Sequence, residues 1–252
     1  MEEEEYMKLF DFAYCGNYNA LLGNLAVLSP EKWSFGDSMD NSILKNYIEY
    51  TFRRVYDEKK VNFETDYAVF NTGLLDKYYS PICAYFVKNK VLQRQTWYLD
   101  GFYTEYQLNT MKVSQIPDRA NYFDDPAELV FDTHLDIVPQ YDHIFGDAEN
   151  MKRLPMSIRT SAMKVQIFNG AIETAKRMLE ANYKTAVPQY YNGKMQLLVP
   201  ICLQNPGIPD LALTCMKNSD KTRYLGSTCL TLDMAYNNAR LIAKPDSNWL
   251  QP

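Results

Sequence analysis

The sequence predicts an α+β protein with a central, mainly antiparallel sheet and flanking helices. Two stretches, residues 40–60 and 166–184, carry the apolar spacing of a helix, and each is followed by several strand-like runs. Short turns rather than helices separate these runs, which favours antiparallel pairing. We therefore expect a single α+β domain over residues 41–252, preceded by an N-terminal helical extension over residues 1–40.

Composition narrows the class of protein. A chain of 252 residues with 46% hydrophobic and 23% charged residues can bury a substantial core. No apolar run approaches the roughly 20 residues that a membrane-spanning helix needs. The first ten residues, MEEEEYMKLF, are acidic where a secretory signal is basic and then apolar. We expect a cytoplasmic protein with no membrane partner.

Cysteine, charge and tyrosine content give three further expectations. The five cysteines are widely spaced and never form CxxC, which argues against a disulfide framework and a thiolate metal site. A net charge of −5 excludes a global basic field that would recruit nucleic acid, although a local basic pocket is compatible with it. The 20 tyrosines suit either a ligand-stacking surface or half-buried sheet positions.

The N-terminal half is predicted in order along the chain. Residues 17–28 suit a short helix ended by Ser29-Pro30, and residues 33–40 form a turn-rich connector. Residues 40–60 place Leu44, Ile48, Phe52 and Val55 on one helical face. Strands are expected at residues 67–75, 81–89 and 96–106, the last two joined as a hairpin.

The C-terminal half begins with a proline-rich middle, residues 110–155, whose one strand candidate is residues 128–138. Residues 166–184 form the most regular helix, with Phe168, Ile172, Ala175 and Leu179 facing inward. Beyond it a meander of strands is expected, and the Asn192-Gly193 pair is a strong hairpin signal.

The last helix, within residues 231–245 (TLDMAYNNARLIAKP), has two expected faces. Its apolar arc consists of Met234, Ala235, Ala239, Leu241 and Ile242, and its polar stripe consists of Asp233, Tyr236, Asn237 and Arg240. Asn238 points into the apolar arc. Because a buried amide without a partner costs about 2 kcal/mol or more, we expect Asn238 to bond a neighbouring strand and to hold the helix in place.

A metal site is considered at the two histidines and rejected. On a strand, Asp132, His134 and Asp136 share one face, but they span about 13 Å and cannot all ligate one ion. The geometric alternative is a metal site that uses two of these residues and is completed by Asp142 or His143, folding back after Pro139. We predict no metal, and the sequence identifies no cofactor.

Catalytic candidates follow from residue type. His143 lies in a loop beside acidic residues, where it suits proton transfer, although a structural role is an equal alternative. The sequence has no GxSxG, GxGxxG or GxxxxGK[ST], which removes the usual nucleophile elbow and phosphate loops.

Binding candidates are amides and arginines set among apolar residues. Asn71, Thr72 and Gly73 form a small turn that could present backbone donors to an anion. Gln189 and Gln196 lie on opposite strands of the Asn-Gly hairpin, where they could be neighbours. Further candidates are Arg153, Tyr236, Asn237, Asn238 and Arg240, which could grip a phosphate and read a base edge. The alternative for each amide is hydrogen bonding to turns and sheet backbones.

Several long phrases carry a family resemblance. FNTGLLDKYYSPICAYF, WYLDGF, LVFDTHLDI, DHIFGDAENMKRLP, AVPQYYNGKMQLLVPICL, PDLAL and LTLDMAYNNARLI resemble the domain of unknown function 3825 family, from about Leu44 to Leu250. In many members of that family the domain looks to be joined to predicted RNA-binding modules, such as cold-shock or OST-HTH domains, and the resemblance therefore implies work on RNA or nucleotides. By motif position the resemblance also adds Asp132 to the site candidates.

Two functions are therefore expected. The first is an enzyme acting on a phosphoester of a nucleotide or RNA, in RNA processing, repair or antiviral defence. It would use His143 to shuttle protons and Arg153 and Arg240 to clamp phosphate, with Asp132 in the catalytic set. The alternative is a non-catalytic module that binds a nucleotide or single-stranded RNA, with Tyr190, Tyr191 and Tyr236 as stacking platforms.

Overall fold

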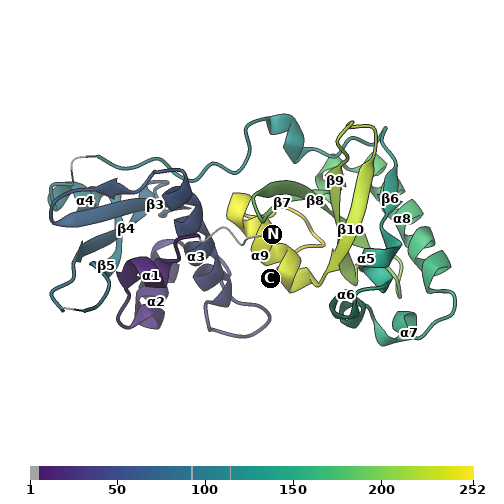
Figure 1. Ribbon diagram of the computed structural model, residues 1–252, viewed down its shortest axis with the longest axis horizontal. Coiled ribbons are helices and arrows are strands. Elements are labelled where there is room, and N and C mark those ends of the chain that lie inside the picture. The colour runs from purple at the N-terminus through teal and green to yellow at the C-terminus, as the bar shows by residue number, and fades with distance from the viewer. Residues whose placement is uncertain (1–5, 92, 114) are drawn as a thin grey trace. The chain divides into compact units, whose positions relative to one another are not determined.

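A computed structural model describes residues 6–91, 93–113 and 115–252. The chain divides into two compact units, unit 1 over Met1–Asn121 and unit 2 over Tyr122–Pro252 (Figure 1). Each unit contains helices and one sheet, so the α+β class is confirmed. The expected single central sheet is replaced by two sheets, and the division near residue 121 differs from the expected boundary near residue 40.

Unit 1 contains a five-stranded sheet in the order β1-β5-β4-β3-β2. The β1–β5 pair is parallel and the other pairs are antiparallel, so the three strands expected between residues 67 and 106 are neighbours. The elements are α1 (Leu9–Phe12), β1 (Ala13–Tyr14), α2 (Tyr18–Leu28), α3 (Ser42–Asp57), β2 (Asn62–Phe63), β3 (Tyr67–Leu75), β4 (Pro81–Lys88), β5 (Trp97–Thr104) and α4 (Glu105–Thr110).

The residues before position 40 belong to the body of unit 1. Ala13 of β1 pairs with Trp97 of β5, and Leu9, Leu22 and Leu25 are fully buried. The sequence suggested an extension because these elements are short, but their apolar side chains find their partners in β5 and α3.

The two faces of the unit 1 sheet are covered differently. On one face Phe52 of α3 packs against Phe70 of β3 and lies near Phe86 of β4, with ring centroids 5.4 and 6.5 Å apart. On the other face Leu108 of α4 packs against Val69 and Cys83. Alternating side chains in β3 and β4 supply both layers, as a strand buried on two faces requires.

Unit 2 contains a second five-stranded sheet in the order β6-β10-β9-β8-β7, in which β6 and β10 are parallel and the other pairs antiparallel. The predicted Asn192-Gly193 hairpin joins β7 to β8. The elements are η1 (Pro126–Leu129), β6 (Ile137–Pro139), α5 (Tyr141–Phe145), α6 (Ala148–Arg153), α7 (Met156–Arg159), α8 (Lys164–Ala181), η2 (Tyr183–Thr185), β7 (Val187–Tyr191), β8 (Lys194–Ile201), β9 (Leu211–Lys217), β10 (Tyr224–Leu230) and α9 (Leu232–Ile242).

Two helices cover opposite faces of the unit 2 sheet (Figure 1). Phe168, Ile172, Ala175 and Leu179 of α8 face the core with the odd-numbered side chains of β8, as predicted for that helix. The even-numbered side chains of β8 share their face with Val187 and Gln189 of β7, against which α9 packs. The sheet is thus the middle layer of three.

The strand predicted at residues 128–138 is wrong for most of its length. Leu129 ends η1, and pairing with β10 begins at Ile137. Between them Asp132 folds the chain, since its carbonyl accepts the N–H of Leu135 at 3.2 Å and its Oδ1 accepts the N–H of His134 at 3.1 Å. An aspartate that satisfies the backbone locally in this way favours a turn over a strand.

Candidate functional site

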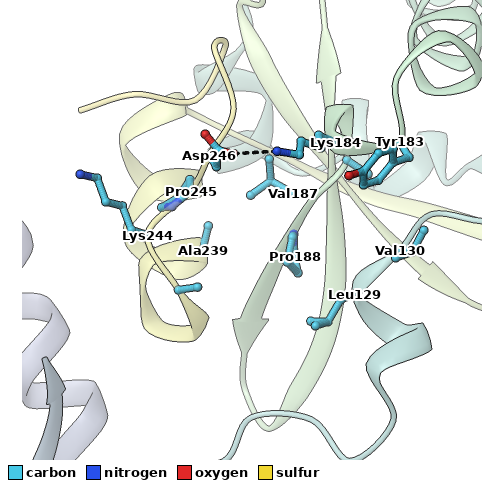
Figure 2. A pocket seen from close by; sticks show the side chains of 12 residues that line it. Leu129, Val130, Tyr183, Lys184, Val187, Pro188, Ala239, Lys244, Pro245 and Asp246 are labelled. Atoms are coloured by element: carbon cyan, nitrogen blue, oxygen red, sulfur yellow. Dashed lines mark hydrogen bonds and ion pairs between the residues drawn. The ribbon is translucent and has the colours of Figure 1, made fainter. Parts of the chain in front are cut away.

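A pocket opens in unit 2 between β7, η1 and the segment that follows α9 (Figure 2). Its volume is about 210 Å3, which is below the roughly 300–1,000 Å3 of pockets for drug-sized ligands. Such a space suits one flat ring system rather than a large ligand. The apolar part of its lining comprises Leu129, Val130, Val187, Pro188, Ala239 and Ala243.

Local sequence explains how the pocket forms. α9 ends at Ile242, and the extended Ala243 with Pro245 two residues later turns the chain out of the helix. The turned segment is then fixed to η2, because Trp249 Nε1 donates to the carbonyl of Thr185 at 2.9 Å. The pocket therefore lies between two chain segments held together by their own contacts.

Polar groups stand at the pocket rim. Tyr183 is 68% exposed and lies at one end, while Lys244 lies at the other end with its amine directed outward (Figure 2). Between them Lys184 Nζ and Asp246 Oδ2 form an ion pair of 2.8 Å. Among the residues that the structure describes, Lys244 makes no hydrogen bond or ion pair. The pocket thus combines an aromatic ring, apolar walls and two cations.

The ion pair shifts both of its groups. The hydrogen bond to Asp246, with its charge, raises the pKa of Lys184, and the same contact lowers the pKa of Asp246. Both side chains are well exposed, so the pair adds little to stability. An anionic ligand could replace Asp246 as the partner of Lys184 at small cost.

A chain of three amides lies beside the pocket wall, between α9 and the sheet. Asn238 Nδ2 donates to Gln189 Oε1 at 3.1 Å, and Gln189 Nε2 donates to Gln196 Oε1 at 2.6 Å. Gln189 is 0% exposed. The expected bond between Asn238 and a neighbouring strand is present, although it reaches a side chain rather than the backbone. Because both ends of its amide are engaged, Gln189 serves structure rather than ligand contact.

The exposed and buried sides of α9 differ from the sequence expectation. Met234, placed in the apolar arc, is 39% exposed, whereas Tyr236 and Arg240 of the polar stripe are 2% and 6% exposed. Tyrosine and arginine carry large apolar bodies, so a polar tip does not keep them at the surface. Asn237 Oδ1 is buried and has no hydrogen-bond partner within the described part of the chain.

The catalytic candidates of unit 2 are dispersed and lie outside the pocket. His143 is exposed on α5, and its carbonyl accepts Asn150 Nδ2 at 2.8 Å. Arg153 ends α6, where its Nη1 donates to the carbonyl of Cys229 in β10 at 3.0 Å. Asp132 is occupied by the turn at His134, whose backbone N–H is the main cause that lowers the pKa of this carboxyl.

The acidic and histidine side chains do not form the strand face considered for metal. Asp132 contacts His134 within the turn, whereas Asp136 pairs with Lys176 of α8 at 2.7 Å. Across residues 6–91, 93–113 and 115–252, no group of three or more His, Cys, Asp or Glu side chains is arranged to hold a metal ion.

The Asn71, Thr72 and Gly73 motif lies in unit 1, at a bulge of β3. Two backbone donors at the bulge are already used, since Gly73 N–H donates to Asn71 Oδ1 at 2.9 Å and Leu74 N–H donates to Thr72 Oγ1 at 3.2 Å. Asn71 Nδ2 also binds the carbonyl of Pro117. The motif shapes the bulge, and these donors are not directed at an anion.

Sequence reasoning missed the residues that line the pocket. Tyr183, Lys184, Lys244 and Asp246 follow the ends of two helices, and neither segment carries a motif. The available signal was the proline at 245 after a predicted helix, which indicates a turn back toward the sheet.

The fold and the pocket define a two-unit α+β protein with a small cavity in its second unit. A family model described as domain of unknown function (DUF3825) matches residues 25–249, so the chain belongs to this family. All residues that line the pocket lie within the matched range. No curated protein and no solved structure gives a significant match. No helix in the described residues is both long and apolar enough to cross a membrane.

Proposed function

We propose that unit 2 is a binding module for a nucleotide or for one base of single-stranded RNA. The observation that carries this proposal is the pocket, which sets an exposed tyrosine ring and two lysines around apolar walls. A base would lie against Pro188 and Tyr183, and its phosphate would extend toward Lys244 and Lys184. Stacking on an aromatic ring contributes about 1–3 kcal/mol per base, whichever base is bound.

The phosphoester enzyme expected from the sequence has less support. Asp132 stabilises a turn, Arg153 binds a backbone carbonyl, and His143 lies on an exposed helix surface. None of these three residues lines the pocket. Catalysis by positioned groups requires them to lie within hydrogen-bond reach of a common substrate. The binding function therefore takes precedence, and product formation is an outcome of its test.

The test is a titration of the whole chain with adenosine and uridine monophosphates, their nucleosides, inorganic phosphate and a short uridine oligomer. Thermal shift reports binding, and the tryptophan fluorescence of the chain includes a contribution from Trp249, which bonds the η2 segment of the pocket. A ligand at one hundred times its Kd stabilises the protein by about 2.7 kcal/mol. We expect monophosphates to bind more tightly than nucleosides or phosphate alone.

Matched variants locate the binding. Tyr183→Ala should weaken binding about tenfold through lost stacking, whereas Tyr106→Ala at a similarly exposed tyrosine of α4 in unit 1 should leave it unchanged. For the oligomer, Lys244→Gln should reduce the salt slope of log K by about 0.7, and Lys152→Gln on α6 serves as its control. Equal affinity in Tyr183→Ala and wild type would remove the pocket from the proposal. Chromatography of the incubated nucleotides for product tests the enzyme alternative.

A further inference from the structure

Three tyrosines form a continuous half-exposed row on one face of the unit 1 sheet. They are Tyr67 of β3, Tyr85 of β4 and Tyr103 of β5, and we call them the tyrosine ladder. The rings of Tyr67 and Tyr85 are stacked with centroids 5.4 Å apart. Tyr85 and Tyr103 meet edge to face at 6.1 Å. The row crosses three adjacent strands diagonally, because Tyr67 lies opposite Val87 and Tyr103 lies opposite Cys83.

The ladder is held in place from below and from the side. Its rings pack on the buried side chains of Val69, Cys83 and Leu108. Gly101 lies opposite Tyr85, and a Cβ at Gly101 would come within 3.1 Å of the Tyr103 ring. Because glycine has no side chain, the Tyr103 ring can lie over Gly101. Rings fixed in this way lose little entropy when a ligand binds.

Two carboxylates place negative charge beside the tyrosine ladder. Asp100 and Asp66 are exposed, and Tyr103 Oη donates to Asp100 Oδ2 at 2.6 Å. Burial raises the pKa of Tyr85, and the charges of Tyr67, Asp100 and Asp66 raise it further. Burial, then the bond and charge of Asp100, raise the pKa of Tyr103 to about 12. The charged groups that act on these two phenols are thus acidic.

We propose that the tyrosine ladder and Asp100 bind an arginine side chain presented by an extended basic segment of a partner protein. A guanidinium stacks on aromatic faces and, at the same time, donates paired hydrogen bonds to a carboxylate. Asp100 can accept both the Tyr103 hydroxyl and a guanidinium, because a carboxylate has about four acceptor positions. Asp66 adds a second negative charge for a neighbouring cation of the same segment.

The charges decide between the candidate occupants. A nucleic acid could stack its bases on the ladder, but its phosphates would be repelled by Asp66 and Asp100. A lysine ammonium would feel the same attraction, yet it lacks the planar fork that stacks and hydrogen-bonds together. The partner surface is therefore cationic and planar, which distinguishes it from the anionic ligand proposed for the pocket of unit 2.

The experiment titrates the whole chain with a short peptide that alternates glycine and arginine, and with its lysine counterpart. Calorimetry gives affinities, and the NMR signals of the tyrosine rings locate the bound peptide. We expect the arginine peptide to bind severalfold more tightly and to shift the ring signals of Tyr85 and Tyr103. Asp100→Asn should weaken binding about threefold, and it keeps an acceptor for Tyr103.

Two further variants and a competing probe make the proposal refutable. Tyr85→Leu should weaken binding about fivefold or more, whereas Tyr79→Leu at the β3–β4 turn should have no effect. If Tyr85→Leu does not fold by circular dichroism, the comparison of Asp100→Asn with Asp37→Asn decides. The proposal would be overturned if the arginine and lysine peptides bound equally well, or if Asp100→Asn left binding unchanged. It would also be overturned if a uridine oligomer bound more tightly than the arginine peptide and shifted the ring signals of the tyrosine ladder.

Discussion

The amide chain between α9 and the unit 2 sheet yields the sharpest stability prediction. Substitution of Asn238 by alanine removes its bond to Gln189 Oε1, an atom of a fully buried residue. An acceptor left without a partner in such a place costs about 1–3 kcal/mol. Alanine is a better helix former than asparagine by up to about 0.7 kcal/mol, which offsets part of the loss. We expect a net destabilisation of about 1.5 kcal/mol.

The neighbouring asparagine provides the matched control. Asn237 occupies the same helix, and its Oδ1 is buried with no hydrogen-bond partner in the described residues. Asn237→Ala therefore gains helix propensity without leaving a bonded atom unsatisfied, and unit 2 should be unchanged or slightly more stable. The two variants alter the same residue type by the same atoms, so their difference isolates the amide chain.

Hydrogen exchange read by mass spectrometry is the assay, because peptides of β7 and β8 report on unit 2 alone. A loss of about 1.5 kcal/mol corresponds to about tenfold faster exchange of amides that open with the unit. A double-mutant cycle with Gln189→Ala should show coupling of about 1 kcal/mol. Equal exchange rates in Asn238→Ala and Asn237→Ala would refute this account of the chain.

Three other expectations concern both units. Glu49 Oε1 is buried and has no hydrogen-bond partner among the described residues, and burial raises the pKa of this carboxyl. The protonated Glu49 side chain therefore contributes its full stability below the usual carboxyl pKa, and this contribution is lost as pH rises through the raised pKa. The free energy of unfolding, measured by urea titration at several pH values, should depend less on pH in Glu49→Gln. Gly73 has φ +75°, and a Cβ there would lie 2.9 Å from Tyr47 Oη. Gly73→Ala should cost about 1–3 kcal/mol of unfolding free energy, and a smaller loss in a Tyr47→Phe background would identify the contact as the cause. Asp246→Asn releases Lys184 from its ion pair, so calorimetry should show severalfold tighter binding of a nucleoside monophosphate, and weaker binding would contradict the assignment of the rim.

Elements that bury one regular face could be predicted from the sequence. The helix with Phe168, Ile172, Ala175 and Leu179 was found because its spacing is uninterrupted, and β3 was predicted with its structural boundaries of Tyr67–Leu75. The region around Asp132 failed because a local hydrogen bond overrode an alternating pattern. Local pattern also could not reveal that two separate sheets replace one, since strand partners are set by tertiary packing.

The candidate site was less predictable than the fold. Asn238 was placed correctly because the cost of a buried amide demands a partner, whatever that partner is. Tyr236 and Arg240 were assigned to the polar side of the helix, but both are buried. The assignment was wrong because it considered only the polar end of each side chain and not its large apolar part. The pocket depends on Tyr183, Lys184 and Lys244, which come together only through the path of the chain after α8 and α9.

Helix α9 connects the stability of unit 2 with the proposed binding function. Asn238 fixes the helix to β7, and the next residue, Ala239, lines the pocket together with Ala243, the first residue after the helix. Because Ala239 belongs to α9 and Ala243 directly follows the end of that helix, any movement of α9 on the sheet changes the width of the pocket. Asn238→Ala should therefore weaken nucleotide binding as well as stability, although Asn238 does not line the pocket. By linkage, a bound nucleotide should slow exchange in β7 of the wild type and should slow it less in Asn238→Ala. A variant that lost stability but kept full nucleotide affinity would show that the amide chain and the pocket are independent.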